Sequence, residues 1–235
     1  MRPEVIRESV PVIKEFIKAY NIPIFEVSGY EADDVIGTLA KQAEKRGIIT
    51  YMMTPDKDYG QLVSETTFIY RPKYGDKEFE VMGIERVKEK FGIETTAQVI
   101  DLLGLMGDSS DNIPGCPGVG EKTAQKLIAQ FGSIESLLER TSELKGALKT
   151  KVEENKEKIL FSKFLATIKT DVPVELDMEL LKREAPDEEK LTTLLDFYEL
   201  RALKERVKKT NLAPSLFDET PEVATTPSSG NKKKE

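Results

Sequence analysis

The first half of the chain alternates between helical and strand-like spacing of its apolar residues. Residues 3–20 carry apolar side chains at helical intervals, and residues 31–46 do so again before Gly47, which predicts the end of that helix. Short apolar runs predict strands at residues 22–27, 48–54, 67–70 and 79–81. The run at 48–54 has the continuous apolar character of a buried parallel strand. Strands alternating with helices predict an α/β layer with a parallel, Rossmann-like sheet flanked by helices.

The second half has helical spacing almost throughout. The predicted helices lie at residues 84–91, 97–106, 121–131, 134–139, 152–168 and 187–209, with an extended segment at 172–176. Beyond residue 210 the chain is rich in Pro, Ser, Thr and Lys, which predicts a disordered tail or linker. We therefore expect an α/β region over residues 1–106, an all-helical subdomain over 107–209 and a tail over 210–235.

Composition narrows the chemistry. The 235 residues include no histidine and a single cysteine, Cys116, which excludes histidine-based catalysis, an intrachain disulfide and the usual zinc sites. Any metal must then have oxygen ligands, which favours Mg²⁺, Mn²⁺ or Ca²⁺. No run is apolar enough to span a bilayer, and no signal peptide is recognisable, so we expect a cytoplasmic protein.

Two acidic clusters follow predicted element boundaries. Glu31, Asp33 and Asp34 open the helix at 31–46, where capping would explain one carboxylate but three within four residues repel one another. Asp56 and Asp58 follow the strand at 48–54, at the strand end where open α/β sheets bind ligands. An ordinary polar loop is the alternative for this second cluster.

A third cluster, Asp108 and Asp111, lies in a loop after an apolar helix, where a simple connector is the alternative. Acids at a helix start, a strand end and a loop can meet at one edge of the domain. Such a group repels itself unless cations bind it. Two divalent ions there would suit phosphodiester hydrolysis without a protein nucleophile. They would also offset the net charge of −7, which otherwise argues against a nucleic-acid partner.

A glycine-rich stretch follows closely on Asp111. Its glycines would allow close approach of a phosphate backbone, and the helix start at residue 121 offers free N–H groups. The candidate DNA-binding residues are Gly115, Gly118, Gly120, Lys122, Thr123 and Lys126. Contacts of this kind would carry no sequence information. A plain helix–helix connector is the alternative.

Three motifs carry a resemblance to a known family. Residues 29–40 (GYEADDVIGTLA), 54–62 (TPDKDYGQL) and 107–124 (GDSSDNIPGCPGVGEKTA) are similar, in order and spacing, to those of the 5′-3′ exonuclease (5′-nuclease, flap endonuclease-like) domain of bacterial DNA polymerase I. The resemblance implies a PIN-like core and a helix–three-turn–helix element. It further implies structure-specific cleavage of DNA with a 5′ flap, nick or end, in replication and repair.

The resemblance also implies roles for single residues. The seven carboxylates of the three clusters would hold two Mg²⁺ or Mn²⁺ ions, with Glu31, Asp33 and Asp34 nearer one ion and Asp108 and Asp111 nearer the other. The glycine-rich loop would bind duplex backbone, with K⁺ held by its carbonyl groups. The family's aspartate-bearing N-terminal strands and its basic helical arch have no match here. We therefore expect an N-terminally truncated monomer that alone binds metal and DNA weakly and cuts poorly or not at all.

Other readings stay open at this point. A PIN-type ribonuclease would share the acidic sheet edge but normally lacks the glycine-rich loop, and a non-catalytic DNA-structure-binding module would not need the acids. In the tail, Ser215, Leu216 and Phe217 slightly resemble the core of sliding-clamp-binding peptides, with random tail sequence as the alternative.

Overall fold

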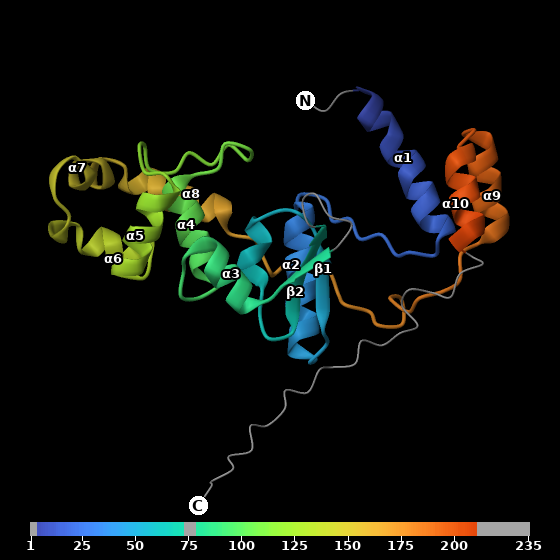
Figure 1. The fold of residues 1–235 in the computed structure, drawn as a ribbon, viewed down its shortest axis with the longest axis horizontal. Helices are drawn as coiled ribbons and strands as arrows, with labels where there is room; N and C mark the ends of the chain where they lie inside the picture. Colours follow the sequence, from blue (N-terminus) through green and yellow to red (C-terminus); the bar gives the residue numbers. More distant parts are fainter. Residues whose placement is uncertain (1–3, 73–78, 211–235) are drawn as a thin grey trace, which may run out of the picture. The chain divides into compact units, whose positions relative to one another are not determined.

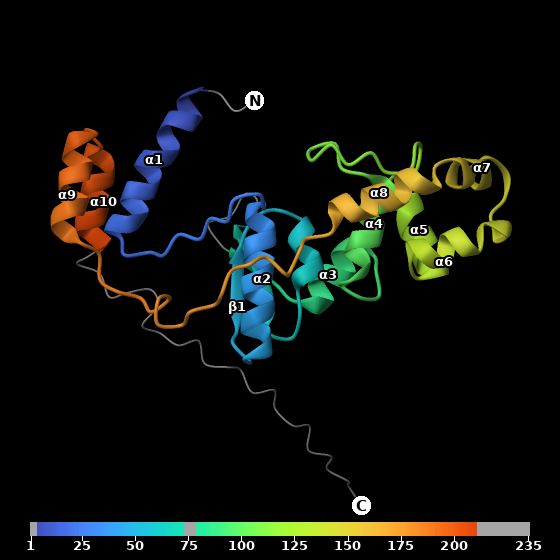
Figure 2. The ribbon, with the colours of Figure 1, turned by 180° about the vertical axis from the view of Figure 1, so that it is seen from behind.

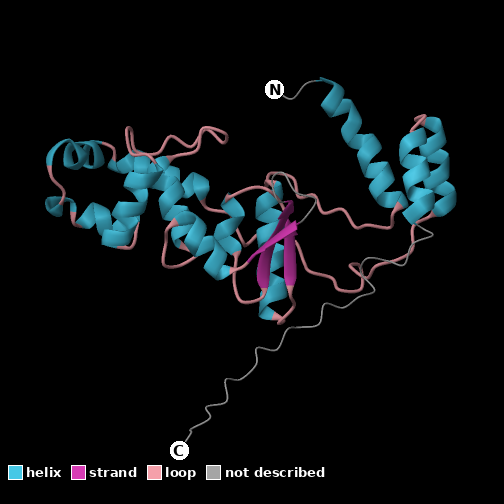
Figure 3. Cartoon of the chain, viewed as in Figure 1, coloured by secondary structure: helices cyan, strands magenta, loops and turns pink. Residues whose placement is uncertain are grey.

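The computed structural model describes residues 4–72 and 79–210. The contacts divide the chain into two compact units, residues 25–178 and residues 1–24 with 179–235. Figure 3 shows a largely helical molecule with one small sheet. In the described parts of the chain, no helix is long and apolar enough to cross a membrane. The predicted division at residue 106 stays a prediction, and the predicted clamp-binding residues lie outside the described residues.

The sheet of the larger unit has three strands in the order β1-β2-β3. β1 (Thr50–Met53) runs parallel to β2 (Thr67–Pro72), as predicted, whereas β3 (Phe79–Met82) runs antiparallel to β2. Six residues separate β2 from β3 in the sequence, too few for the crossover that a parallel pair needs. The sheet is therefore mixed rather than wholly parallel.

Two strand predictions need correction. The described chain has no strand at residues 22–27, where Pro23 has no N–H to donate to a ladder. β1 is buried on one face only: Met52 packs into the core, but Tyr51 and Met53 are 56% and 74% exposed. The second face instead carries aromatic side chains, with Tyr51 stacked on Phe68.

Helices make up the rest of this unit (Figure 1). They are α2 (Ala32–Lys45), α3 (Ile84–Phe91), α4 (Gln98–Met106), α5 (Glu121–Phe131), α6 (Ile134–Glu139), α7 (Gly146–Glu154) and α8 (Lys156–Ala166), with short 3₁₀ turns η1 (Asp58–Leu62) and η2 (Thr141–Glu143). The helix predicted at 152–168 is wrong as one element. It breaks at Asn155, whose side-chain amide donates to the Lys151 carbonyl and caps the end of α7.

Helix α4 is the centre of the core and packs closely against α8. Leu102, Leu103 and Leu105 are fully buried. Gly104 lets the two helices approach, since a β-carbon there would lie 2.8 Å from Ile134 Cδ1 and 3.0 Å from Lys163 Cα. Any larger residue at position 104 would push α8 away from α4.

An extended segment after α8 runs along α2 (Figure 2). Thr38, Gln42 and Arg46 lie on one face of α2, and their side chains bind the backbone of this extended segment. The Thr38 hydroxyl accepts from the Val172 N–H. The Gln42 amide donates to the Val174 carbonyl and accepts from the Leu176 N–H, and Arg46 donates to the Leu176 carbonyl. The predicted extended conformation at 172–176 is confirmed, and its backbone partners are side chains of α2.

The smaller unit contains α1 (Glu4–Ala19), α9 (Glu188–Phe197) and α10 (Arg201–Thr210). Ala19, Leu191 and Leu195 form its buried centre. The single helix predicted at 187–209 is wrong, because Glu199 adopts a φ of +53° and separates α9 from α10.

Candidate active site

The first acidic cluster opens α2. Glu31 is the N-cap, and its N–H donates to Asp34 Oδ2 over 3.4 Å, as in a capping box. Asp34 Oδ1 accepts the backbone N–H of Lys169 at 2.8 Å, and Asp33 Oδ1 accepts the N–H of Asp34 at the same distance. Helix capping therefore involves all three acids, since Glu31 and Asp34 form the capping box and Asp33 accepts the N–H of Asp34, so it explains more of this cluster than the single carboxylate predicted. Burial, with Asp34 and Asp56 nearby, raises the pKa of Asp33.

The second cluster follows β1 and starts η1. Asp56 Oδ1 accepts the N–H of Asp58 at 3.0 Å, which turns the chain and sends Asp58 inward. Asp58 is only 8% exposed, and its Oδ1 is buried with no hydrogen-bond partner among the described residues. Burial, followed by the charges of Asp56, Asp108 and Asp111, raises the pKa of Asp58 to about 7, against the lowering effect of Lys57.

The third cluster is a loop closed by a pair of glycines. Asp108 and Ile113 exchange two backbone hydrogen bonds of 2.8 Å. Beneath them Gly107 (φ +73°) lies against Gly115 (φ +60°), where a β-carbon on Gly115 would lie 2.4 Å from Gly107 N. Only glycine fits at position 115, because both the conformation and the space exclude a side chain.

Lys57 is a site residue that sequence analysis missed. Its ammonium group forms an ion pair with Asp108 Oδ2, while the N–H of Ser110 binds Asp108 Oδ1. Burial opposes ionisation of Asp108, but these two hydrogen bonds hold its pKa below the ordinary value. The sequence did contain a signal for this role: Lys57 lies between Asp56 and Asp58, so its ammonium group must lie near the acidic side chains of that cluster.

The three clusters meet in the larger unit. We call Asp58, Asp108 and Asp111 the inner group; one carboxylate oxygen from each lies within 4.8 Å of the others. We call Glu31, Asp33 and Asp34 the rim group; together with Asp58 they line a cavity of about 200 Å³. Asp58 belongs to the inner group and also lines this cavity, and the Asp56 carboxylate accepts a hydrogen bond from the Asp58 backbone N–H. All seven predicted carboxylates therefore lie in one neighbourhood.

The donor set fits hard divalent cations. Every candidate ligand is a carboxylate oxygen, the kind that Mg²⁺, Mn²⁺ and Ca²⁺ prefer. The unpartnered Asp58 Oδ1 is costly unless a cation or proton satisfies it. Lys57 offsets only part of the negative charge.

The glycine-rich loop leads from the inner group into α5. Gly118 and Gly120 are exposed, as are Lys122 and Lys126 in the first turns of α5, while Thr123 is half-buried. Gly115 differs from the prediction: it is buried, and its N–H donates to Ser162 Oγ at 3.0 Å. Its N–H is therefore occupied and cannot bind a phosphate. Sequence analysis also missed Lys151, whose ammonium lies 2.5 Å from the position of a β-carbon on Gly118.

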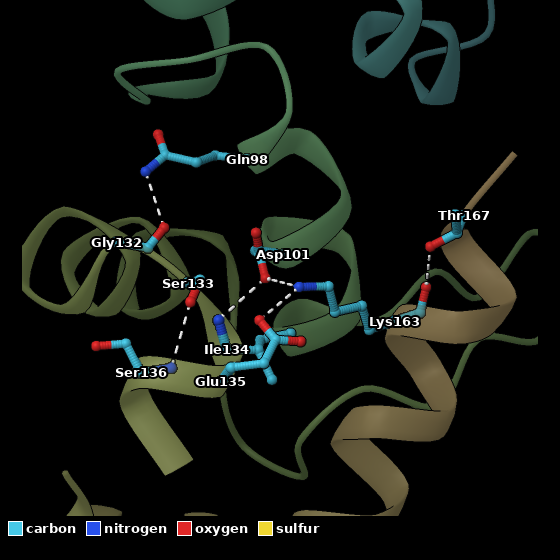
Figure 4. Close-up of polar contacts among 9 residues, drawn as sticks. All are labelled: Gln98, Asp101, Gly132, Ser133, Ile134, Glu135, Ser136, Lys163 and Thr167. Atoms are coloured by element: carbon cyan, nitrogen blue, oxygen red, sulfur yellow. Dashed lines mark hydrogen bonds and ion pairs between the residues drawn. The ribbon is translucent and has the colours of Figure 1, made fainter. Parts of the chain in front are cut away.

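A polar cluster joins α8 to α4 and α6 (Figure 4). Lys163 Nζ donates to Asp101 Oδ1 at 2.6 Å and to Glu135 Oε2 at 2.8 Å, and the N–H of Ile134 donates to the same Asp101 oxygen. Burial favours the neutral amine, but the two carboxylates outweigh it and raise the pKa of Lys163. Helices α4, α6 and α8 are thereby joined through the buried carboxylate of Asp101 and the half-buried ammonium of Lys163.

Known proteins match nearly the whole chain. Residues 1–92 match the family described as 5′-3′ exonuclease, N-terminal resolvase-like domain, and residues 94–189 match 5′-3′ exonuclease, C-terminal SAM fold. DNA polymerase I of Bacillus subtilis is 46% identical over 206 residues, and that of Bacillus caldotenax is 41% identical over 220. The matches take in 87% and 93% of this chain but 23% and 24% of those proteins, so the chain spans about a quarter of their length.

Solved structures share the fold at low sequence identity. T5 D15 protein co-crystallised with metal ions has a TM-score of 0.61 at 19% identity, covering 83% of this chain and 74% of that one. The catalytic core of Rad2 in complex with DNA substrate has a TM-score of 0.55 at 18% identity, covering 81% and 62%. The two family matches, one after the other along the sequence, also favour this family over PIN-type ribonucleases. The chain therefore belongs to the 5′-3′ exonuclease family and contains both its resolvase-like and its SAM-fold regions.

Proposed function

We propose that the acidic site is a divalent-metal nuclease centre that hydrolyses phosphodiesters in DNA with a 5′ flap, nick or end, as part of a DNA polymerase I acting in replication and repair. The observation that carries this proposal is the convergence of carboxylates around the buried, unpartnered Asp58 Oδ1. Family membership supports nuclease chemistry, and the names of two similar structures mention metal ions and DNA substrate.

We assign two Mg²⁺ or Mn²⁺ ions to the seven carboxylates, one toward the rim group and one toward the inner group. Such a pair, when bound, supplies an activated water and stabilises the attacking and leaving oxygens of the phosphate. The protein's own part is to hold the carboxylates in place. Asp34 is fixed by the Lys169 N–H and Asp58 by η1, while Lys57 neutralises Asp108 until cations bind.

We further propose that the exposed part of the glycine-rich loop binds DNA backbone without sequence preference. Gly118 and Gly120 offer close approach, and Lys122, Lys126 and half-buried Thr123 add donors at the start of α5. A K⁺ ion held by the loop carbonyls, a monomeric state and a cytoplasmic location complete the proposal.

Metal binding and cleavage test the proposal together. We expect calorimetry with Mn²⁺ to show binding that Asp108→Asn weakens by about a hundredfold, as expected for loss of a ligand. Glu139→Gln, which changes an exposed carboxylate on α6, is the matched control and should bind Mn²⁺ like the parent chain.

We expect cleavage of a 5′-flap DNA by the parent chain with Mg²⁺ to be weak; Glu139→Gln should keep that weak activity and Asp108→Asn should lose it. Flap binding with no Mn²⁺ binding would contradict the nuclease centre and favour a DNA-structure-binding module. Equal Mn²⁺ affinity in Asp108→Asn and the parent would contradict the ligand assignment.

A further inference from the structure

The cavity beside the rim group has two chemically different walls. Glu31, Asp33, Asp34 and Asp58 form one wall. The other wall is the end of α8 and the residues after it; it is apolar at Phe164, Leu165, Ala166 and Ile168 and also contains Thr167 and Lys169. A ligand that fills this cavity must offer a charged part to one side and an apolar part to the other.

Phe164 is the large aromatic side chain of the apolar wall. It is 65% exposed, and its ring stacks on Phe161, itself 55% exposed, with centroids 6.5 Å apart and an interplanar angle of 20°. Leu165 beside it is 43% exposed. None of the three belongs to the buried core. An exposed apolar surface beside a polar cavity is unfavourable in water and is typical of a binding site.

The apolar wall is held rigidly. Gly104 lets the backbone of α8 pack on α4, and Lys163, the residue before Phe164, is held by Asp101 and Glu135 (Figure 4). On the other side, Gln61 of η1 donates to the Ala166 carbonyl at 2.9 Å and accepts from the Ile168 N–H at 3.0 Å. Rigid support means that little conformational entropy is lost when a ligand packs on Phe164.

Hydrogen bonds also fix the position of this wall relative to the carboxylates. The Lys169 N–H binds Asp34 Oδ1, and Gln61 belongs to the same turn that begins with Asp58. The distance between the two walls is therefore set by hydrogen bonds.

We infer that Phe164 is a stacking platform for a nucleobase, and that this base belongs to the nucleotide whose phosphate lies against the carboxylates. A nucleotide combines an anionic group that cations can join to the acids with a flat base that stacks on an aromatic ring. Stacking of this kind tolerates any base sequence. The base must leave the stack of its neighbours to present a face, which an unpaired nucleotide at a flap junction does most easily, so the platform favours such a nucleotide at the cleavage point. The inference rests on the proposed function and adds the residue that positions the substrate strand.

Fluorescence of 2-aminopurine tests the platform without needing turnover. The base analogue is placed at the unpaired junction position of a 5′-flap DNA, with Ca²⁺ as the cation, and its emission falls when it stacks on a ring. We expect quenching by the parent chain and by Phe164→Trp, little quenching by Phe164→Ala, and flap affinity about tenfold lower in Phe164→Ala.

Phe197→Ala is the matched control, because Phe197 is a 76% exposed phenylalanine on α9 in the other unit. It should quench and bind as the parent does. Circular dichroism of Phe164→Ala checks that α8 still forms, and loss of quenching with an unchanged spectrum supports a contact rather than misfolding.

Two outcomes separate this inference from the proposed function. If the parent chain binds the flap and Mn²⁺ but quenches the analogue equally with and without Phe164, the platform is wrong and the nuclease centre stands. If the parent chain binds the flap and quenches the analogue through Phe164 but binds no Mn²⁺, the stacking platform stands and the nuclease centre is wrong.

Discussion

The inner and rim groups of carboxylates differ in how they meet water. Asp58 and Asp108 of the inner group are 8% and 6% exposed, whereas the rim group lies at the open start of α2. The inner acids are held by tight turns and by an ion pair with Lys57, while Asp34 at the rim is held by backbone N–H groups. Asp111, the third inner acid, is exposed, and Lys57 stabilises the charge of Asp108, so burial makes the charge of Asp58 the costly one and the need for a cation is concentrated there.

The largest expected effect is loss of function in Asp58→Asn. The change removes a carboxylate that belongs to the inner group and also lines the cavity of the rim group, so Mn²⁺ affinity should fall at least about a hundredfold and any weak cleavage by the parent chain should be lost. The metal-free variant should unfold at the same or a higher temperature, because it no longer buries an unpartnered carboxylate. Thermal unfolding measures the stability of the variant, and calorimetry on the same samples measures its Mn²⁺ affinity. A clear drop in the unfolding temperature would show that Asp58 supports the fold rather than the metal.

The glycine pair under the inner group offers the next largest effect. Gly115→Ala places a methyl group 2.4 Å from Gly107 N at a φ of +60°, so the free energy of unfolding should fall by roughly 3 kcal/mol. Gly120→Ala is the matched control: its φ is −94° and no atom lies within 4 Å of the new carbon, so it should cost under about 1 kcal/mol. Urea unfolding measures both. Equal losses would contradict the close approach at Gly107.

The pH dependence of stability should report the buried or half-buried carboxylates of both groups, Asp58 most strongly. The folded chain keeps a proton on Asp58 up to about pH 7, whereas the unfolded chain releases it near 3.8. The folded state thus binds more protons in this window, and metal-free stability falls as pH rises through it. Burial raises the pKa of Asp33 in the same direction. Mn²⁺ favours the ionised acids, so its stabilising effect should be larger at about pH 8 than at about pH 5.

Thermal unfolding of the parent and of Asp58→Asn, with and without Mn²⁺, tests this dependence. The metal-free parent should lose stability between the two pH values, and the variant should lose less. A parent chain whose metal-free stability rises over the same range would mean that Asp58 is ionised when buried.

The smallest expected effect concerns Asp34 in the rim group. Asp34→Ala removes the acceptor of the Lys169 N–H and should cost about 1 kcal/mol of stability, whereas Asp34→Asn keeps an acceptor oxygen and should cost less. Both remove one negative charge and should weaken Mn²⁺ binding alike. Urea unfolding and Mn²⁺ titration of the two variants separate the structural role from the metal role. Identical stabilities would mean that the bond to Lys169 contributes little.

Rules that depend only on neighbouring residues predicted the positions of the acidic clusters along the chain. Helix starts, strand ends and turn residues are properties of neighbouring residues, which is why the three acidic clusters and most helix positions followed from the sequence. What could not be predicted depends on contacts between distant segments. The ion pair of Lys57 with Asp108, the capture of Gly115 by Ser162 and the one-sided burial of β1 all depend on which elements pack together. The breaks at Asn155 and Glu199 escaped because neither residue is a glycine or proline.

The extended segment after α8 has a consequence for how the fold tolerates change. Side chains of Thr38, Gln42 and Arg46 take the place of a neighbouring strand for its backbone groups, one helical turn after another. A β-strand would receive its partners from main chain, which every residue type supplies. Here three particular side chains supply them, one of which, Thr38, is buried, so substitutions on that face of α2 would release a distant segment of the chain and loosen the contact of Lys169 with Asp34. The conformation of this segment therefore depends on side chains of α2 as well as on its own buried Val172 and Leu176.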